Sequence, residues 1–327
     1  MKLIATNFLL LQVVVITVRT IRIVQGNDDG WAEQYTRSFH DALRLKGHTV
    51  VLSAPAENQS GTGEYSPPRF HKVRVHGKML PQLVGSSEKK PSAREEACQY
   101  NSCPAHSGAY GHNSSRPELN WVNSYPATSI KYGIENFGPD LWSGESPELA
   151  VTGPNVGHNV GWKAVHRSGT VGAAVYAAHK ARIKIPALAF SAPDAPRAPW
   201  KKNPVPKQST LYAELAVAIT QKIIDSGKPY LPEDVFLNVN FPRYHGRCNK
   251  TSDFRFILSR LNPGSPLRKD VKWCKTQRLP WEWEVVHRSK CCVSISIGDA
   301  SDKTTMNDVA KQRVVLNKLK EILTCFD

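Results

Sequence analysis

The sequence predicts an α/β protein with a three-layer, Rossmann-like architecture, in which a mostly parallel sheet is flanked by helices and followed by a C-terminal extension. Two observations support this prediction. Short apolar runs typical of buried strands alternate with segments of helical periodicity as far as about residue 242. Several of these runs end in polar turns that contain glycine, and α/β proteins bind ligands at such strand ends.

The first strand, helix and strand lie within residues 21–53. The run IRIVQG predicts a buried strand, and the turn Asn27-Asp28-Asp29-Gly30 follows it. The next segment, WAEQYTRSFHDALRLKG, has apolar side chains at helical spacing and ends in a glycine, which favours a helix that stops there. Residues 49–53 predict a second buried strand. Such a unit predicts two parallel strands joined by a right-handed crossover.

The later elements continue this alternation. The predicted helices lie at 125–138, 168–181 and 211–225, and the predicted strands at 149–152, 185–191 and 235–240. A looser C-terminal region adds a strand at 293–297 and a helix at 308–323. We therefore expect a single domain over residues 20–327, with an insertion loop at about 84–120 and a C-terminal arm and helix at about 243–327.

The first residues are typical of a secretory signal peptide. Lys2 precedes an apolar segment that reaches Val18. Asn7 and Gln12 interrupt this segment, which is shorter than the ~20 apolar residues that a membrane span requires. We expect residues 1–19 to be a signal peptide, the mature protein to be secreted, and no membrane anchor.

Cysteines and sequons agree with an oxidising compartment. The chain has seven cysteines, so at least one must lie outside any intrachain pairing. Cys98 and Cys103 suit a local disulfide, and a zinc site that uses nearby histidines is the alternative. The pairing of the other cysteines stays open. Asn-x-Ser/Thr sequons predict glycosylation at Asn113 and Asn249.

The chain is strongly basic, with a formal net charge of +15. A basic surface attracts anions such as phosphates, nucleotides and acidic glycans. The lysines and arginines are spread along the chain rather than gathered in one run, so we expect a solvated basic face and no stable complex with nucleic acid.

Adjacent carboxylates follow the first predicted strand. Asp28 and Asp29 would repel each other at a strand end unless a cation lay between them, and a divalent metal is the simplest solution. An ordinary solvated turn is the alternative, because Asn, Asp and Gly are common turn formers. Ser60 and Asn155 follow two further predicted strands, and their oxygens complete a ligand set suited to Mg²⁺ or Mn²⁺, with Ca²⁺ as an alternative. The helix that begins near Ser168 would offer backbone N–H groups to a phosphate.

These motifs resemble the survival protein E (SurE) family of phosphatases and nucleotidases, and the chain is most similar to secreted fungal-type members. The matching segments are IRIVQGNDDG, LRLKGHTVVLSAPAENQSGTG, GPDLWSGE, VTGPNVGHNVGW, SGTVGAA, IPALAFS, LNVNFP and CVSISIGDASDKT. The resemblance spans about residues 20–305 in consistent order. Departures such as Gln25-Gly26 before the aspartates change the shape of the pocket but remove no ligand oxygen.

The resemblance implies a metal-dependent phosphomonoesterase that hydrolyses nucleoside monophosphates or other small phosphate esters through a metal-activated water. It places metal ligands at Asp28, Asp29, Ser60 and Asn155, with Asp28 also accepting the proton of the water, and phosphate-binding groups at Ser168, Gly169 and Thr170. Asn58 and Asn159 are further candidates for phosphate binding, and a glycan on the Asn58 sequon would crowd the site. Related proteins assemble through C-terminal arms, so residues 243–290 are a candidate contact for a homodimer or tetramer.

Two other functions stay open at this point. A haloacid-dehalogenase-type phosphatase also places aspartates after its first strand, but it uses a D-x-D pattern, whereas Gly30 stands at the third position here. The net charge of +15 would also suit a non-catalytic secreted protein that binds anions or glycans.

Overall fold

The computed structural model describes residues 19–63, 70–75, 78–83, 90–193, 195–288 and 291–326, and for 70–83 it describes the backbone alone. The predicted signal peptide therefore lies outside the described residues, except for residue 19. Within the described ranges, no helix is both long enough and apolar enough to span a membrane.

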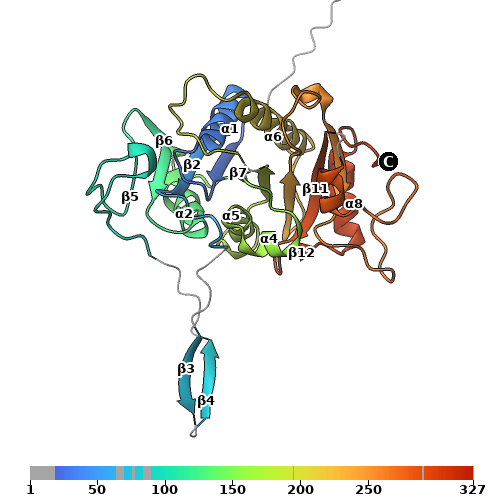
Figure 1. Ribbon diagram of the computed structural model, residues 1–327, viewed down its shortest axis with the longest axis horizontal. Coiled ribbons are helices and arrows are strands. Elements are labelled where there is room, and N and C mark those ends of the chain that lie inside the picture. The colour runs from blue at the N-terminus through green and yellow to red at the C-terminus, as the bar shows by residue number, and fades with distance from the viewer. Residues whose placement is uncertain are drawn as a thin grey trace, which may run out of the picture.

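A ten-stranded sheet forms the centre of the molecule, with the strand order β10-β11-β9-β8-β7-β1-β2-β6-β5 and with β12 paired to β11 (Figure 1). The strands from β9 to β6 in this order are parallel, whereas β5 and β11 join their inner neighbours antiparallel. The strands are β1 (Arg22–Gly26), β2 (Thr49–Pro55), β5 (Tyr110–Asn113), β6 (Arg116–Val122), β7 (Leu149–Val156), β8 (Ala187–Ala192), β9 (Val235–Asn240), β10 (Arg255–Ser259), β11 (Cys292–Asp299) and β12 (Thr304–Thr305). A separate antiparallel hairpin is formed by β3 (Phe70–Val75) and β4 (Lys78–Leu83).

Helices cover both faces of this sheet, which confirms the predicted three-layer α/β fold. They are α1 (Gln34–Leu45), α2 (Pro126–Tyr132), α3 (Gly138–Leu141), α4 (Gly161–Arg167), α5 (Gly169–Val175), α6 (Lys207–Asp225), α7 (Glu282–His287) and α8 (Val309–Leu319). Successive side chains of a strand point to opposite faces, so Ile23 packs with the layer of α1 and α6, and Val24 with the layer of α2 and α5.

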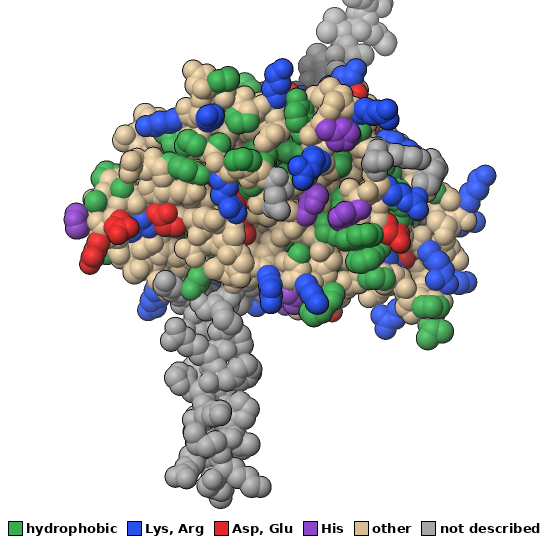
Figure 2. Space-filling view, in the orientation of Figure 1, with side chains coloured by type: hydrophobic (Ala, Val, Ile, Leu, Met, Phe, Trp, Pro, Cys, Tyr) green, Lys and Arg blue, Asp and Glu red, His purple; other side chains and the backbone are tan. Residues whose placement is uncertain are grey.

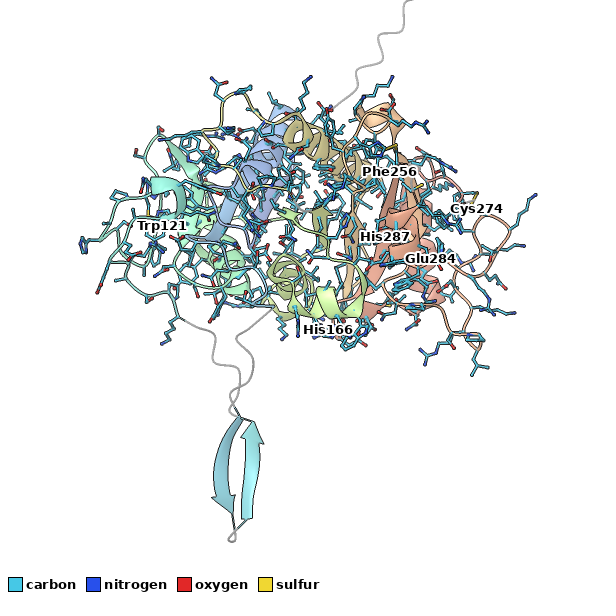
Figure 3. All side chains as sticks on the ribbon, in the orientation of Figure 1. Trp121, His166, Phe256, Cys274, Glu284 and His287 are labelled. Carbon is cyan, nitrogen blue, oxygen red and sulfur yellow. A yellow bond between two sulfur atoms is a disulfide. The ribbon has the colours of Figure 1, made fainter. Side chains whose placement is uncertain are left out.

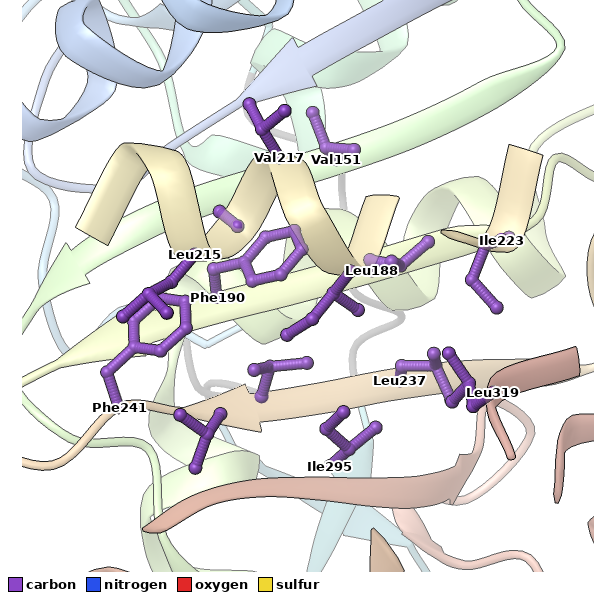
Figure 4. Packing of buried hydrophobic residues seen from close by; sticks show 14 of the residues in the cluster. Val151, Leu188, Phe190, Leu215, Val217, Ile223, Leu237, Phe241, Ile295 and Leu319 are labelled. Carbon is purple, nitrogen blue, oxygen red and sulfur yellow. The ribbon is translucent and has the colours of Figure 1, made fainter. Parts of the chain in front are cut away.

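The larger core lies between the sheet and α6. Figure 4 shows Leu215 of α6 against Phe190 of β8, and Leu237 of β9 close to Leu319 of α8. Each of these side chains is fully buried. Burial of one such side chain stabilises the fold by about 1.5–3 kcal/mol, so this layer holds the parallel strands, and the loops at their ends, in fixed positions.

The structure corrects two predicted boundaries. The segment 84–120, predicted to be an insertion loop, contains β5 and most of β6, which extend the sheet beyond β2. The apolar stretch LNWV begins only at residue 119, and the first residues of β6 are not buried, so the segment itself has little apolar periodicity. The strand predicted at 149–152 continues to residue 156, across an irregularity in its pairing with β8 at Gly153 and Pro154. In the sequence, a glycine followed by a proline predicts the end of a strand, but the pairing of β7 with β8 resumes at Asn155.

Charged groups are distributed as expected from the sequence. Lysine and arginine side chains are scattered over the face shown in Figure 2 rather than collected in one patch. On this face, positive charge is therefore spread widely rather than concentrated at one site.

Candidate active site

The predicted loops meet at one edge of the sheet. β1 lies between β2 and β7 and is parallel to both, and the chain continues from β2 to one side of the sheet and from β7 to the other. The crevice between such strands is where open α/β sheets bind ligands. A cavity of about 210 Å³ opens here, lined by Asp28, Ser60, Gly61, Asn155, Val156, Asn159, Ala164, Arg167, Ser168 and Arg197. A larger hollow of about 600 Å³ lies over α1 and α6 and contains none of these residues.

Asp28 is buried at the end of β1, and the start of α5 holds its carboxylate. Its Oδ1 accepts a hydrogen bond of 2.5 Å from the Thr170 hydroxyl, and the backbone N–H groups of Gly169 and Thr170 also bond to it. Burial raises the pKa of Asp28, and these hydrogen bonds oppose the shift. Gly169 permits the contact, since a Cβ at that position would lie 2.8 Å from Cβ of Asp28.

Asp29 is completely buried and turns toward the loop that follows β2. Its Oδ2 accepts from the backbone N–H of Val156 at 2.7 Å, and its Oδ1 accepts from Nε of Arg197 at 2.7 Å. Burial and the neighbouring charge of Asp28 raise the pKa of Asp29 to about 7, although Arg197 opposes the shift. The two carboxylates therefore gain strongly from any additional positive charge.

Ser60 approaches the aspartates through a loop that Asn58 orders. The Ser60 hydroxyl lies 3.3 Å from Oδ1 of Asp29 and 2.7 Å from Oδ1 of Asn58, which also accepts from the Ser60 backbone N–H. Asn58 is exposed and does not line the cavity. Its observed role is to shape the turn that presents Ser60.

Asn155 and Asn159 form another wall of the cavity. Asn159 is fixed by neighbouring strands, since its Nδ2 donates to the Ser191 hydroxyl at 2.7 Å and its backbone N–H donates to Asn240 at 2.9 Å. Nδ2 of Asn155 donates to the Gly157 carbonyl at 2.7 Å. Oδ1 of Asn155 is buried and has no hydrogen-bond partner among the described residues, and no other cavity-lining side chain has such an atom. A buried carbonyl oxygen of this kind is suited to a ligand.

Three of the four predicted metal-binding side chains line the cavity, whereas Asp29 does not line it and contacts Ser60 at 3.3 Å. Their oxygens suit a hard divalent cation. Two carboxylates, a hydroxyl and an amide carbonyl are the donors that Mg²⁺, Mn²⁺ and Ca²⁺ prefer. Within the described ranges, no group of three or more His, Cys, Asp or Glu side chains is placed to hold a metal, so a site of the zinc type is not found there.

The predicted phosphate-binding groups separate into two sets. Ser168 and Asn159 line the cavity. Gly169 and Thr170 do not line it, because their N–H groups and the threonine hydroxyl are directed at Asp28. The Ser168 hydroxyl accepts from the Val171 N–H at 3.0 Å and caps α5.

Sequence reasoning missed Arg197, which contributes positive charge to the site. Its Nη2 lies 3.1 Å from the Ser60 hydroxyl, and its side chain is 35% exposed, so it faces both the aspartates and the solvent. The loop that carries it is bonded to the start of α1 through Gln34 and Ala198. The available signal was its place after β8, at the same sheet edge as the aspartates.

Sequence reasoning also missed Glu282, which does not line the cavity but holds the start of α4. This completely buried carboxylate accepts hydrogen bonds from the Gly161 N–H at 2.6 Å, the Ser296 hydroxyl at 2.7 Å and the Asn238 amide at 3.0 Å. Gly161 is the first residue of α4, whose Ala164 and Arg167 line the cavity. Burial raises the pKa of Glu282 to about 8.

The predicted disulfide between Cys98 and Cys103 is present, and it excludes the alternative zinc site at these two residues. Two further disulfides join Cys248 to Cys291 and Cys274 to Cys325. The seventh cysteine, Cys292, is buried in β11 and belongs to none of the three.

The two predicted glycosylation sites differ in their surroundings. The side chain of Asn249 lies on an exposed turn, where its Nδ2 donates to the Gly246 carbonyl at 2.7 Å. Asn113 is half-buried at the end of β5, and its Oδ1 accepts from the backbone N–H groups of Ser115 and Arg116.

Comparisons with known proteins identify the family of this chain. The family model for survival protein SurE matches residues 23–261. The chain is 32% identical to a 5'-nucleotidase SurE of Methanothrix thermoacetophila, over 73% of this chain and 72% of that protein. It is 28% identical to an acid phosphatase of Yarrowia lipolytica over 67% of this chain, but the match spans only 56% of that protein.

A solved structure shows the same fold. The SurE protein from Aquifex aeolicus superposes with a TM-score of 0.52 at 19% identity, over 90% of this chain and 98% of the other. The family match excludes the haloacid-dehalogenase alternative. The chain therefore belongs to the SurE family, whose members carry the names of phosphoric monoester hydrolases, 5'-nucleotidase and acid phosphatase.

Proposed function

We propose that this chain is a metal-dependent phosphomonoesterase that hydrolyses nucleoside monophosphates or other small phosphate esters. The observation that carries the proposal is that Asp28, Ser60 and Asn155 line one cavity, with Asp29 in contact with Ser60. The buried Oδ1 of Asn155 has no partner in the described part of the chain. Family membership and the names of the relatives support the same reaction class.

Different side chains would bind the metal and orient the phosphate. Asp28, Asp29, Ser60 and Asn155 would hold Mg²⁺ or Mn²⁺, with Ca²⁺ as the alternative, and the bound ion would polarise the phosphoryl group and lower the pKa of a water. Ser168 and Asn159 would orient the phosphate by hydrogen bonds. Arg167 and Arg197 place positive charge at the cavity, which favours the anionic substrate over a neutral one.

Asp28 is the side chain suited to accept the proton of the attacking water. The Thr170 hydroxyl bonds to its Oδ1, and the backbone N–H groups of Gly169 and Thr170 also bond to the carboxylate, which fixes its position for this role. Its raised pKa also makes this carboxylate a better base than an exposed aspartate at neutral pH.

The Asp28→Asn variant tests this proposal. We expect hydrolysis of AMP and p-nitrophenyl phosphate by the wild-type protein with Mg²⁺ or Mn²⁺, inhibition by EDTA, and a decrease in kcat of roughly 10²–10⁴-fold in the variant. Asp225→Asn on the exposed end of α6 is the matched control and should keep full activity. Hydrolysis that survives both EDTA and Asp28→Asn would contradict a metal-dependent reaction at this site.

We also propose that the protein is secreted after removal of residues 1–19, that residues 20–327 act as one domain, and that the arm at 243–290 contacts a second subunit. The three disulfides and the exposed Asn249 support secretion.

The intact mass of the secreted protein, measured before and after enzymatic deglycosylation, should locate the cleavage near residue 19 and show glycans on Asn113 and Asn249. Light scattering of the same sample should report a dimer or a tetramer.

A further inference from the structure

We propose that Trp281, Trp283, His287 and His158 form a stacking platform for the base of a nucleoside monophosphate bound in the cavity. We call these four side chains the aromatic ladder. This inference rests on the proposed phosphomonoesterase function and adds the residues that would distinguish a nucleotide from an aliphatic phosphate ester.

The four rings form a continuous series. The Trp281 and Trp283 rings stack with their centroids 5.5 Å apart and their planes at 25°, and the Trp283 and His287 rings stack at 4.3 Å and 22°. The His287 ring lies 6.5 Å from the ring of His158 at an angle of 60°. These separations lie within or close to the range in which aromatic rings attract each other beyond simple burial.

None of the four ladder side chains lines the cavity, but His158 adjoins its wall in the chain. His158 directly precedes Asn159, which lines the cavity, and its Nε2 lies 2.7 Å from the Phe241 carbonyl oxygen. At the other end, Trp281 lies beside Gly161, where an added Cβ would meet the indole ring at 3.9 Å. A substrate whose phosphate occupies the cavity would therefore have the ladder on the side of α4 and α7.

The ladder is held in a fixed position. The indole N–H of Trp281 donates to the Leu261 carbonyl at 2.9 Å, and the next residue, Glu282, accepts three hydrogen bonds. A platform that is already ordered loses little conformational freedom when a ring stacks on it.

The two middle rings of the series are exposed. Trp283 has 46% of its surface exposed, and His287 is also exposed. Figure 3 shows His287 close to Glu284, and in Figure 2 histidine and hydrophobic side chains adjoin each other on the visible face. Exposed aromatic surface next to a phosphate-sized cavity suits a ligand that has a phosphate at one end and a planar ring at the other.

A comparison of two substrates tests the platform. We expect Trp283→Ala to raise KM for AMP by roughly 5- to 100-fold, the effect of losing one base stack, and to leave KM and kcat for glycerol 2-phosphate within about twofold. Trp283→Phe keeps a planar ring and should restore most of the affinity for AMP. Adenosine, which has no phosphate, should quench tryptophan fluorescence in the wild-type protein and much less in Trp283→Ala.

Trp162→Ala provides the matched control. Trp162 is 56% exposed on α4 and packs edge-on against His166, outside the ladder. Its loss should therefore leave KM and kcat unchanged for both substrates. Equal losses for AMP and glycerol 2-phosphate in Trp283→Ala would assign a purely structural role to the ring, and no change for AMP would overturn the platform. A wild-type protein that hydrolyses neither substrate but binds adenosine through Trp283 would contradict the proposed function and leave the platform supported.

Discussion

At the scale of single residues, the site depends on the close approach of Gly169 to Asp28. A Cβ at Gly169 would lie 2.8 Å from Cβ of Asp28 and 2.7 Å from Cγ of Pro126, closer than such carbons approach in proteins. Both neighbours belong to packed elements, so the methyl group would displace Asp28 rather than find space.

We therefore expect Gly169→Ala to lower kcat/KM by about 10²-fold, since a displacement near 1 Å can cost that much. Steady-state hydrolysis of AMP measures the effect. Gly246→Ala is the control, because an added Cβ there meets no atom within 4 Å. Unchanged activity in Gly169→Ala would show that the position of Asp28 is not critical.

The sequence could identify some of these residues but not others, for a physical reason. Adjacent carboxylates directly after a buried strand are unusual enough to indicate a site, and Ser60 and Asn155 follow or end neighbouring strands. Arg197 and Glu282 come from loops and a short helix that reach the site through tertiary packing, and no local pattern records where such a segment docks. The local sequence pattern also could not show that Gly169 and Thr170 bond to the Asp28 carboxylate and do not line the cavity.

At the scale of elements, prediction succeeded where burial is complete. β1, α1, β2, β8, α6 and β9 have apolar residues at regular spacing because both faces of the central strands are covered. β5 and β6 lie at the edge of the sheet, where solvent replaces one layer and the apolar pattern weakens. α4 begins only at the last two residues of the glycine-rich segment GPNVGHNVGW, and its single buried residue, Val165, gives no apolar periodicity.

Glu282 connects two of these elements, α7 and α4. Removal of its carboxylate would leave the Gly161 N–H, the Ser296 hydroxyl and the Asn238 amide without their acceptor in a buried region. We expect Glu282→Ala to lower the free energy of unfolding by about 2–4 kcal/mol, since each unsatisfied buried group costs about 1–3 kcal/mol and the region can partly relax.

Urea denaturation measures this loss. Glu284→Ala lies on the same helix at an exposed position and should change stability by less than about 0.5 kcal/mol. Equal stability of Glu282→Ala and Glu284→Ala would mean that the buried network contributes nothing to the docking of α7.

At the scale of the whole molecule, buried carboxyl groups link stability to pH. Burial raises the pKa of Glu282 to about 8, and burial together with the charge of Asp29 raises that of Glu33 to about 8. In the unfolded chain a glutamate titrates near pH 4.3. Between these values the folded protein keeps protons that the unfolded chain releases, so the stability they confer is complete below pH 4.3 and is lost as pH rises through 8.

Histidines act in the opposite direction at lower pH. Burial lowers the pKa of His40 and His48, so the folded protein binds fewer protons there than the unfolded chain, and stability rises with pH until about 6.5. Asp29, with a pKa raised to about 7, adds to the effect of the glutamates in metal-free protein. The carboxyl groups therefore dominate the pH dependence between pH 6.5 and 8.

We expect the free energy of unfolding of the EDTA-treated protein to fall across this window, by up to about 1.4 kcal/mol per pH unit for each protonated carboxyl group. Urea denaturation at pH 6.5, 7.0, 7.5 and 8.0 measures the slope. Glu282→Gln removes one titrating group and keeps the size of the side chain. The free energy of unfolding of this variant should therefore fall less steeply with pH than that of the wild-type protein, by the contribution of one carboxyl group. A stability that stays constant or increases from pH 6.5 to 8 would show that these buried side chains are ionised in the folded protein, and that the fold holds their charges without a bound cation.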